Sequence, residues 1–384
     1  TVTGVQTCAL PILKEAVFLQ EVKEIQLLKN ALTLLDWDSS TGMPEKSSPF
    51  RGEVEGYLTG LYFERSIGPV IQEALAYFET RPEELSELGK LVFEKVKEEY
   101  ALNKNVPAER MQEYVKVLNQ AHTDWLKARA AQDFGLLEET LTKVVAFQKE
   151  FIPYWQKEEK TPYDVLLNQF EPGMTVEKLD QVFDQVKQGI QEIRTVLAEK
   201  GTPPRTDFLS RKMTKEQQRR FVIGVVEQLG YDFSKGRLDD TVHPFMTALN
   251  RNDARITTRW EENNFSMATF GVIHEAGHGM YEQNFDPKFD FTPLSEGASM
   301  GIHESQSLFN EIIIGSNRAF WQKQYPFFQE CAEGTFDDIA FEDFYASLKE
   351  TKASLIRIDS DSLTYPLHII IRYEIEKMLF NGSL

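Results

Sequence analysis

The sequence predicts a mainly α-helical protein, and three observations support this fold class. Apolar residues recur at steps of three and four along most of the 384-residue chain, which is the period of amphipathic helices. Only residues 253–260 show the near-alternating, β-branched pattern of a strand. No internal repeat, low-complexity segment or Gly/Ser-rich linker interrupts the helical pattern. The length suits one large domain or two of medium size, with an ample core.

The first predicted helix covers residues 19–35. Its apolar face contains Val22, Ile25, Leu28, Leu32 and Leu35. The Asp, Ser, Gly and Pro residues of segment 36–44 are expected to end this helix. Residues 84–150 then predict two or three further amphipathic helices with solvated charged faces.

A later helix is expected at residues 176–197, where apolar residues again form one stripe. Thr175 is placed to cap its N-terminus, and Gly201 is placed to end it. Because Pro and Gly interrupt helices, Pro162 and residues 201–205 are the expected boundaries between two lobes.

The composition excludes several function classes. The formal charge is −18, from 42 basic and 60 acidic residues, which argues against nucleic acid or an anionic membrane as the main partner. No apolar run approaches the roughly 18–20 residues that a membrane helix needs. Two cysteines, Cys8 and Cys331, cannot form a disulfide framework, so we expect a cytoplasmic location.

Residues 1–12 differ from the charged, helix-periodic sequence that follows them. They lack an initiator Met and the basic region and unbroken apolar core of a secretory signal. They resemble a translated sequencing adapter, although a frayed native terminus is the alternative. We therefore expect a non-native leader at 1–12 and a single helical domain at 13–384.

The segment His274-Glu275-Ala276-Gly277-His278 carries the strongest chemical signal. On a helix, residues four apart share one face with Cβ atoms roughly 5–6 Å apart, so both imidazoles can bind one Zn²⁺. Glu275 projects about 100° away, where it can take a proton from a water activated by the metal. The alternative is two core histidines on a buried helix face. The Glu between two scarce His residues favours the metal site.

A zinc site needs a third protein ligand. Tyr281 and Asn284 stand at the Gly and His positions of the extended HExxHxxGxxH pattern, so an acidic residue is expected instead. The candidates are Glu282, Glu296, Glu304 and Glu311. Glu304 is favoured because it opens a helix expected to continue to residue 314. Glu311 follows one helical heptad later.

Three other histidines are weaker candidates. His243 stands beside Pro244, where histidines are usually structural, although a role near the metal or the substrate stays open. His303 adjoins Glu304 but faces about 100° away, which makes it a weak ligand candidate. His122 has no neighbour that suggests a function.

Three arginines stand in apolar sequence, and a guanidinium can hold a carboxylate through two parallel hydrogen bonds. They are Arg255, Arg357 and Arg372. A buried salt bridge is the favoured interpretation for Arg255 and Arg372. An exopeptidase needs such a group to recognise a free C-terminus.

Several ordered motifs together resemble the carboxypeptidase Taq family of zinc metallocarboxypeptidases. They are HPF (243–245), DARIT (253–257), HEAGH (274–278), GIHESQS (301–307) and IRIDSDSLTYPLHIIIRYEIE (356–376). The resemblance implies a mainly helical, two-lobed fold with a deep substrate groove and a very small sheet near the metal. It also implies a cytoplasmic homodimer that removes single C-terminal residues with broad specificity.

The resemblance assigns roles residue by residue. His274, His278 and Glu304 match the metal ligands of the family, and Glu275 matches its general base. Two further elements are expected to shape the site. The DxRxT element contains Asp253, Arg255 and Thr257, and the HPF element contains His243. Arg357 lies in a segment that the family places at the groove, so we expect it to bind the substrate carboxylate. The alternative is a structural ion pair with Asp359 or Asp361.

The chain lacks one part of the family pattern. The family carries a later GxxQDxHW motif and a C-terminal helical region, which do not occur before the chain stops at Leu384. We therefore expect a C-terminally incomplete chain whose metal site forms while its catalysis is impaired.

The sequence thus predicts a zinc carboxypeptidase that acts on peptides with a free C-terminus, with Co²⁺ or Mn²⁺ as alternative metals. A zinc oligopeptidase or endopeptidase of similar helical architecture is the main alternative. A non-catalytic helical binding module with a relic metal site is the third, and the intact Glu275 counts against it.

Overall fold

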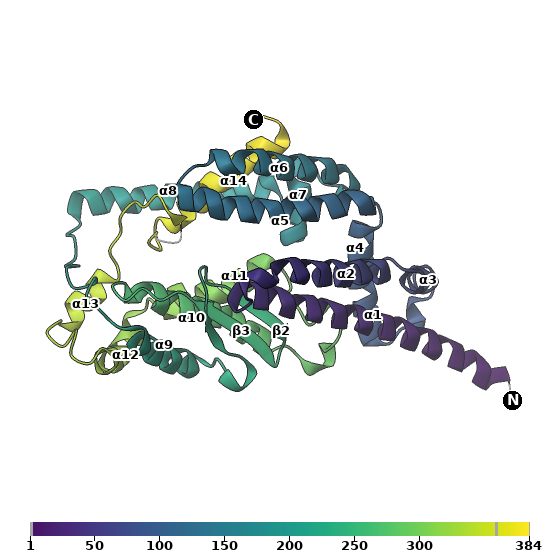
Figure 1. Ribbon diagram of the computed structural model, residues 1–384, viewed down its shortest axis with the longest axis horizontal. Helices are drawn as coiled ribbons and strands as arrows, with labels where there is room; N and C mark the ends of the chain where they lie inside the picture. The colour runs from purple at the N-terminus through teal and green to yellow at the C-terminus, as the bar shows by residue number, and fades with distance from the viewer. Residues whose placement is uncertain (1–2, 358–359, 384) are drawn as a thin grey trace. The chain divides into compact units, whose positions relative to one another are not determined.

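The computed structural model describes residues 3–357 and 360–383, which form helices and one very small sheet (Figure 1). The expectation of a mainly α-helical fold is therefore confirmed. Residues 1 and 2 of the segment expected to be a leader lie outside the described residues, and the first helix begins at Thr3. No helix of the described part of the chain is long and apolar enough to span a bilayer.

The chain divides into two compact units, one of residues 1–92 and 187–368 and the other of residues 93–186 and 369–384. The first unit contains α1 (Thr3–Thr41), α2 (Ser48–Ser66), α3 (Pro69–Phe78), α9 (Lys215–Leu229), α10 (Phe265–Gln283), α11 (Met300–Leu308), α12 (Arg318–Cys331) and α13 (Phe341–Ser347). The second contains α5 (Ala108–Ala131), α6 (Gly135–Trp155) and α7 (Pro162–Phe170). Both units share α4 (Glu87–Asn103), α8 (Val176–Lys200) and α14 (Tyr365–Asn381).

The unit boundaries fall inside these three shared helices, and not at Pro162 or residues 201–205. The sequence does not reveal these boundaries, because the composition of a continuous helix does not change where the helix passes from one unit to the other. The helices predicted at 84–150 and 176–197 are present as α4 to α6 and as α8.

The predicted end of the first helix is only partly right, because α1 continues to Thr41. Arg51 of α2 explains the extra turn. Its guanidinium forms an ion pair with Asp38 and donates a 2.8 Å hydrogen bond to the carbonyl of Leu35. These contacts come from another helix, so the local pattern of residues 36–44 does not reveal them.

The strand predicted at residues 253–260 is β3 (Asp253–Thr258), the central strand of a three-stranded sheet. β1 (Leu238–Asp240) pairs with β3 in parallel, and β2 (Met246–Asn250) pairs with it antiparallel. The backbone N–H of Phe245 donates to the Thr257 hydroxyl at 2.9 Å, and that hydroxyl donates to the Phe245 carbonyl at 2.8 Å. The HPF and DARIT motifs are therefore joined at this sheet.

An aromatic core supports α10 within the first unit. Phe265, Val272, Ile273 and Ala276 of α10 are buried in a cluster that also contains residues of α9, α12 and β3. The same face of α10 also approaches the sheet closely, because a Cβ at Gly279 would lie 2.7 Å from the ring of Tyr231 and 3.5 Å from Ile256 of β3. α9 and α11 pack against α10 as well. α10 is therefore held from several sides, which fixes the direction of its remaining side chains.

The second unit has its own core. α5 packs against α6, and the rings of Tyr114 and Phe151 meet edge to face with centroids 5.4 Å apart. Tyr373 of α14 donates a 2.7 Å hydrogen bond to Asp180 of α8.

Candidate metal centre and active site

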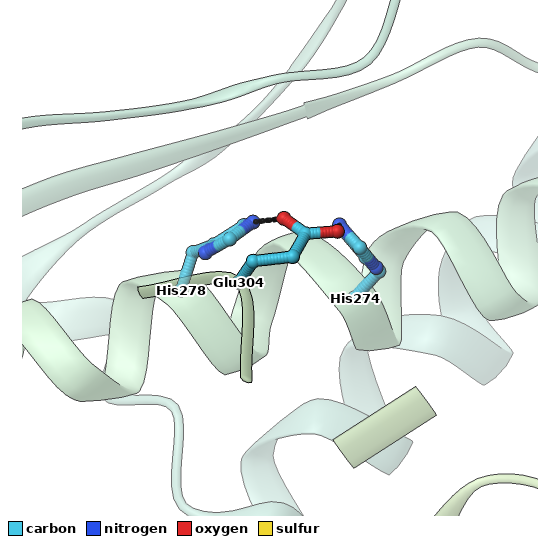
Figure 2. Close-up of side chains that lie close together, drawn as sticks. All are labelled: His274, His278 and Glu304. Atoms are coloured by element: carbon cyan, nitrogen blue, oxygen red, sulfur yellow. Dashed lines mark ion pairs between the residues drawn. The ribbon is translucent and has the colours of Figure 1, made fainter. Parts of the chain in front are cut away.

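Two helices of the first unit bring the three candidate ligands together. His274 and His278 lie one turn apart on α10, and Glu304 lies on α11. Figure 2 shows the carboxylate of Glu304 between the two imidazoles. Its Oε1 lies 3.9 Å from Nε2 of His274, and its Oε2 lies 3.4 Å from Nε2 of His278.

The donor set fits a divalent metal ion. The three residues each offer one ligand atom within 4.8 Å of the others. Ligand atoms that sit about 2.0–2.1 Å from a tetrahedral ion are separated by roughly 3.3–3.4 Å. The separation between Glu304 and His278 matches this value, and the one between Glu304 and His274 is somewhat longer. Two imidazoles and one carboxylate are also the ligand types found in open, catalytic zinc sites.

Gly277 allows the two helices to approach each other. A Cβ at this position would lie 2.7 Å from both the Gln306 carbonyl oxygen and the Ser307 Cα. Such distances are shorter than real carbon contacts allow, so a side chain would push α11 away from α10. The glycine inside the HEAGH segment is therefore needed to bring Glu304 to the histidines.

The side of the His274 ring that faces away from Glu304 is held by a second carboxylate. Nδ1 of His274 lies 2.8 Å from Oε2 of Glu311. Glu311 stands on a turn of π-helix, η5 (Phe309–Ile314), that follows α11 directly. Such wide turns change the direction of side chains and are frequent at functional sites. This contact leaves Nε2 of His274 free to bind a metal.

His278 is held in a different way. Its Nδ1 lies 2.6 Å from Nδ1 of His303, and Nε2 of His303 lies 2.9 Å from Oε1 of Glu282. His303 therefore does not approach as a ligand. It stands between His278 and the almost completely buried carboxylate of Glu282.

Glu275 is the buried carboxyl beside this site. It is 7% exposed, and burial raises its pKa from 4.5 to about 7, with Glu304 and Glu311 adding to the rise and His274 opposing it. The pKa of Glu304 is instead below its usual value, because of a hydrogen bond from His278 and the nearby charges of His274 and Arg357. Two neighbouring carboxyls with opposite shifts are typical of acid–base sites.

Comparison with known proteins places this arrangement in a family. The family model described as carboxypeptidase Taq (M32) metallopeptidase matches residues 17–384. The chain belongs to the carboxypeptidase Taq (M32) family of metallopeptidases. Membership makes it a carboxypeptidase, a hydrolase that acts on peptide bonds.

Individual M32 relatives agree with this assignment. The chain is 44% identical to carboxypeptidase 1 of Bacillus subtilis (strain 168) over 96% of its own length and 74% of that protein. It is 33% identical to thermostable carboxypeptidase 1 of Thermus thermophilus, over 94% and 73% of the two chains. The crystal structure of the M32 carboxypeptidase from Deinococcus radiodurans R1 superposes with a TM-score of 0.91 at 33% identity. The match covers 97% of this chain and 74% of that one.

The DxRxT residues of this M32 chain pair with each other. Arg255 donates to both oxygens of Asp253, at 2.7 and 2.8 Å, and its guanidinium lies 4.4 Å from the centre of the Trp37 ring. Among the described residues, neither Asp253 nor Arg255 forms a hydrogen bond or ion pair with the three candidate ligands. His243 is exposed in the loop between β1 and β2.

Arg357 is the arginine whose charge reaches the site. It donates a 3.2 Å hydrogen bond to the hydroxyl of Tyr365 and lowers the pKa of Glu304. Asp359, one of the two alternative partners of Arg357, lies outside the described residues, and Asp361, the other, accepts instead from the backbone N–H groups of Leu363 and Thr364. Within residues 3–357 and 360–383, Arg357 forms no ion pair with a carboxylate.

The remaining candidates lie in other settings. Arg372 pairs with Glu376 at 2.7 Å but is 73% exposed, so the expected buried salt bridge is wrong for this residue. Glu296 forms an ion pair with Lys29 at 2.5 Å.

Sequence reasoning missed two residues at this site. Gly277 lies inside the HEAGH segment, and a glycine between two ligands on a helix is the signal that indicates its close contact with another helix. Tyr365 stands before Pro366 in apolar sequence, and no local signal indicates its hydrogen bond to Arg357.

Proposed function

We propose that this chain is a zinc-dependent metallocarboxypeptidase of broad specificity, in which His274, His278 and Glu304 hold the metal and Glu275 is the general base. One observation carries the proposal. The three ligand atoms converge within 4.8 Å beside a buried carboxyl whose pKa is about 7. The names of the relatives, which are carboxypeptidases, support removal of residues from the C-terminus.

When bound, the metal ion supplies a Lewis acid for the scissile carbonyl and lowers the pKa of a water toward about 7. The protein provides the proton transfer. Glu275 takes a proton from the attacking water and gives it to the leaving amine. A pKa near neutrality suits both steps, because the carboxyl can accept and release a proton at the same pH.

Arg357 is our candidate for the group that restricts cleavage to chain ends. Its guanidinium is exposed, and Tyr365 fixes one of its nitrogens through a 3.2 Å hydrogen bond. A fixed guanidinium can bind a carboxylate through two parallel hydrogen bonds. His243, Asp253 and Arg255 are proposed to shape the same site without contacting the metal.

Two further proposals concern the protein as a whole. The single buried free cysteine among the described residues, Cys331, is compatible with a reducing cytoplasm. The resemblance to the family supports a homodimer.

The experiment that tests the proposed function compares one peptide as free acid and as C-terminal amide. We expect release of single C-terminal residues from the acid, loss of this activity after chelation, and its return with Zn²⁺. Glu275→Gln should keep the metal and lose about 10²–10⁴ in rate. Internal cleavage of both peptide forms would instead identify an endopeptidase.

A further inference from the structure

Nδ1 of His278 is held by a histidine and not by a carboxylate. A chain of two short contacts runs from His278 through His303 to Glu282, with lengths of 2.6 and 2.9 Å. The other histidine of α10, His274, meets the carboxylate of Glu311 directly at 2.8 Å. The two candidate ligands therefore have chemically different partners.

Counting ring protons fixes the direction of this chain. When Nε2 of neutral His278 offers its lone pair to a metal, the proton of that ring must be at Nδ1. This N–H can donate only to a ring nitrogen of His303 that carries no proton. The proton of His303 is therefore at Nε2, where it donates to Glu282. One arrangement of protons satisfies every group.

The ring of His303 is also fixed by packing. The Tyr281 ring meets it at nearly a right angle, with centroids 5.3 Å apart, and the Tyr281 hydroxyl accepts a hydrogen bond from the backbone of Ala298. A Cβ at Gly297 would lie 2.6 Å from Cδ2 of His303. The Tyr281 ring and the loop before α11 therefore restrict rotation of the His303 ring.

From these contacts we infer that Glu282 and His303 are positioning residues that set the ring orientation and the tautomer of His278 for metal binding. This inference rests on the metal site of the proposed function, and it gives His303 a role that is neither metal ligand nor substrate contact. Partners of metal-bound histidines typically contribute about 10–100-fold to metal affinity.

Two substitutions of His303 separate its two hydrogen bonds. In His303→Asn, the side-chain oxygen takes the place of Nδ1 and still accepts from His278. In His303→Gln, the amide nitrogen takes the place of Nε2 and still donates to Glu282, while His278 loses its acceptor. We expect the Zn²⁺ dissociation constant, measured by competition with a chelator, to rise about 10–100-fold for Gln and much less for Asn.

A steric variant tests the same inference without changing a hydrogen-bonding group. Gly297→Ala should displace the His303 ring and weaken Zn²⁺ binding in the same range. Gly271→Ala is the matched control, because a Cβ there lies 4.0 Å from its nearest neighbour, the Thr258 hydroxyl, and leaves the site unchanged. The thermal midpoint of each metal-free variant shows whether it is folded.

The outcomes are distinguishable. Equal dissociation constants for wild type, His303→Gln and Gly297→Ala would overturn the inference while leaving the metal site intact. Lower thermal midpoints with unchanged Zn²⁺ affinity would overturn it as well, because His303 would then be only structural. If wild type bound Zn²⁺ no better than His274→Ala, the proposed metal site would fail, and the positioning role with it.

Discussion

The carboxylate of Glu311 lies 2.8 Å from Nδ1 of His274, although the two residues stand on different helical segments. The π-helical turn from Phe309 to Ile314 directs Glu311 back toward α10. An ionised carboxylate at this position orients the imidazole and increases its basicity as a ligand. The contact therefore indicates that Glu311 orients the His274 ring and is not itself one of the three candidate ligands.

Replacing Glu311 should weaken metal binding without removing a ligand. Glu311→Leu is expected to raise the Zn²⁺ dissociation constant about 10–100-fold, and Glu311→Gln, which keeps an acceptor, should have a smaller effect. Glu296→Gln is the matched control, because Glu296 pairs with Lys29. Chelator competition measures all three constants. A Glu296 variant that loses as much affinity as Glu311→Leu would contradict this assignment.

Gly277→Ala tests whether helix contact sets the metal geometry. The added methyl would meet backbone atoms of α11 at 2.7 Å, so α11 must move and carry Glu304 away from the histidines. We expect weaker Zn²⁺ binding and a loss of about 1–3 kcal/mol in the free energy of unfolding, the range for overpacking a core. Gly271→Ala again serves as the control, and unchanged metal affinity in Gly277→Ala would show that α11 adapts.

The raised pKa of Glu275 makes the stability of the metal-free protein depend on pH. Its folded-state pKa of about 7 exceeds the ordinary value of 4.5, so the folded protein binds more protons between these values. Stability therefore falls as the pH rises from 4.5 to above 7, by about 3 kcal/mol in total at this residue.

Glu275→Gln should remove this dependence. Chemical denaturation of the chelator-treated proteins at pH 5 and pH 8 measures the effect. Relative to wild type, the free energy of unfolding of the variant should be higher by most of this difference of about 3 kcal/mol at pH 8 and by little at pH 5. An equal gain at both pH values would mean that Glu275 is not a buried carboxyl with a raised pKa.

Arg357→Ala should change the preference for free carboxylates. If Arg357 binds the terminal carboxylate, the bound peptide covers its guanidinium. The variant then loses about 2–5 kcal/mol of transition-state stabilisation with free-acid peptides, the range for breaking a charge pair that is buried in the complex. It should lose little of any residual activity on amidated peptides. The readout is the ratio of kcat/KM for the acid and amide forms of one peptide. A ratio equal to that of wild type would assign the carboxylate to another group.

The sequence was sufficient to predict the features that depend on local periodicity. The period of α10 placed His274 and His278 on one face, and the alternation at 253–260 predicted β3. Both results follow from side-chain direction along one element. The extension of α1 to Thr41 was missed because it depends on Arg51, which belongs to another helix.

The roles of Glu282, His303 and Glu311 could not be predicted in the same way. All three were considered as ligands, because spacing along one helix cannot show how two helices cross. The crossing of α10 and α11 depends on Gly277 and places His303 against His278. The partner of each imidazole is therefore a property of tertiary packing, which the sequence pattern of a single helix does not contain.

Metal content tests the central claim most directly. Purified wild type, Glu304→Ala and the control Glu296→Gln are dialysed with Zn²⁺ and then analysed for bound metal per chain. The account predicts about one tightly bound ion in wild type and in Glu296→Gln, and a large loss in Glu304→Ala, because three protein ligands are typical of such a site. Equal metal content in wild type and Glu304→Ala would contradict it.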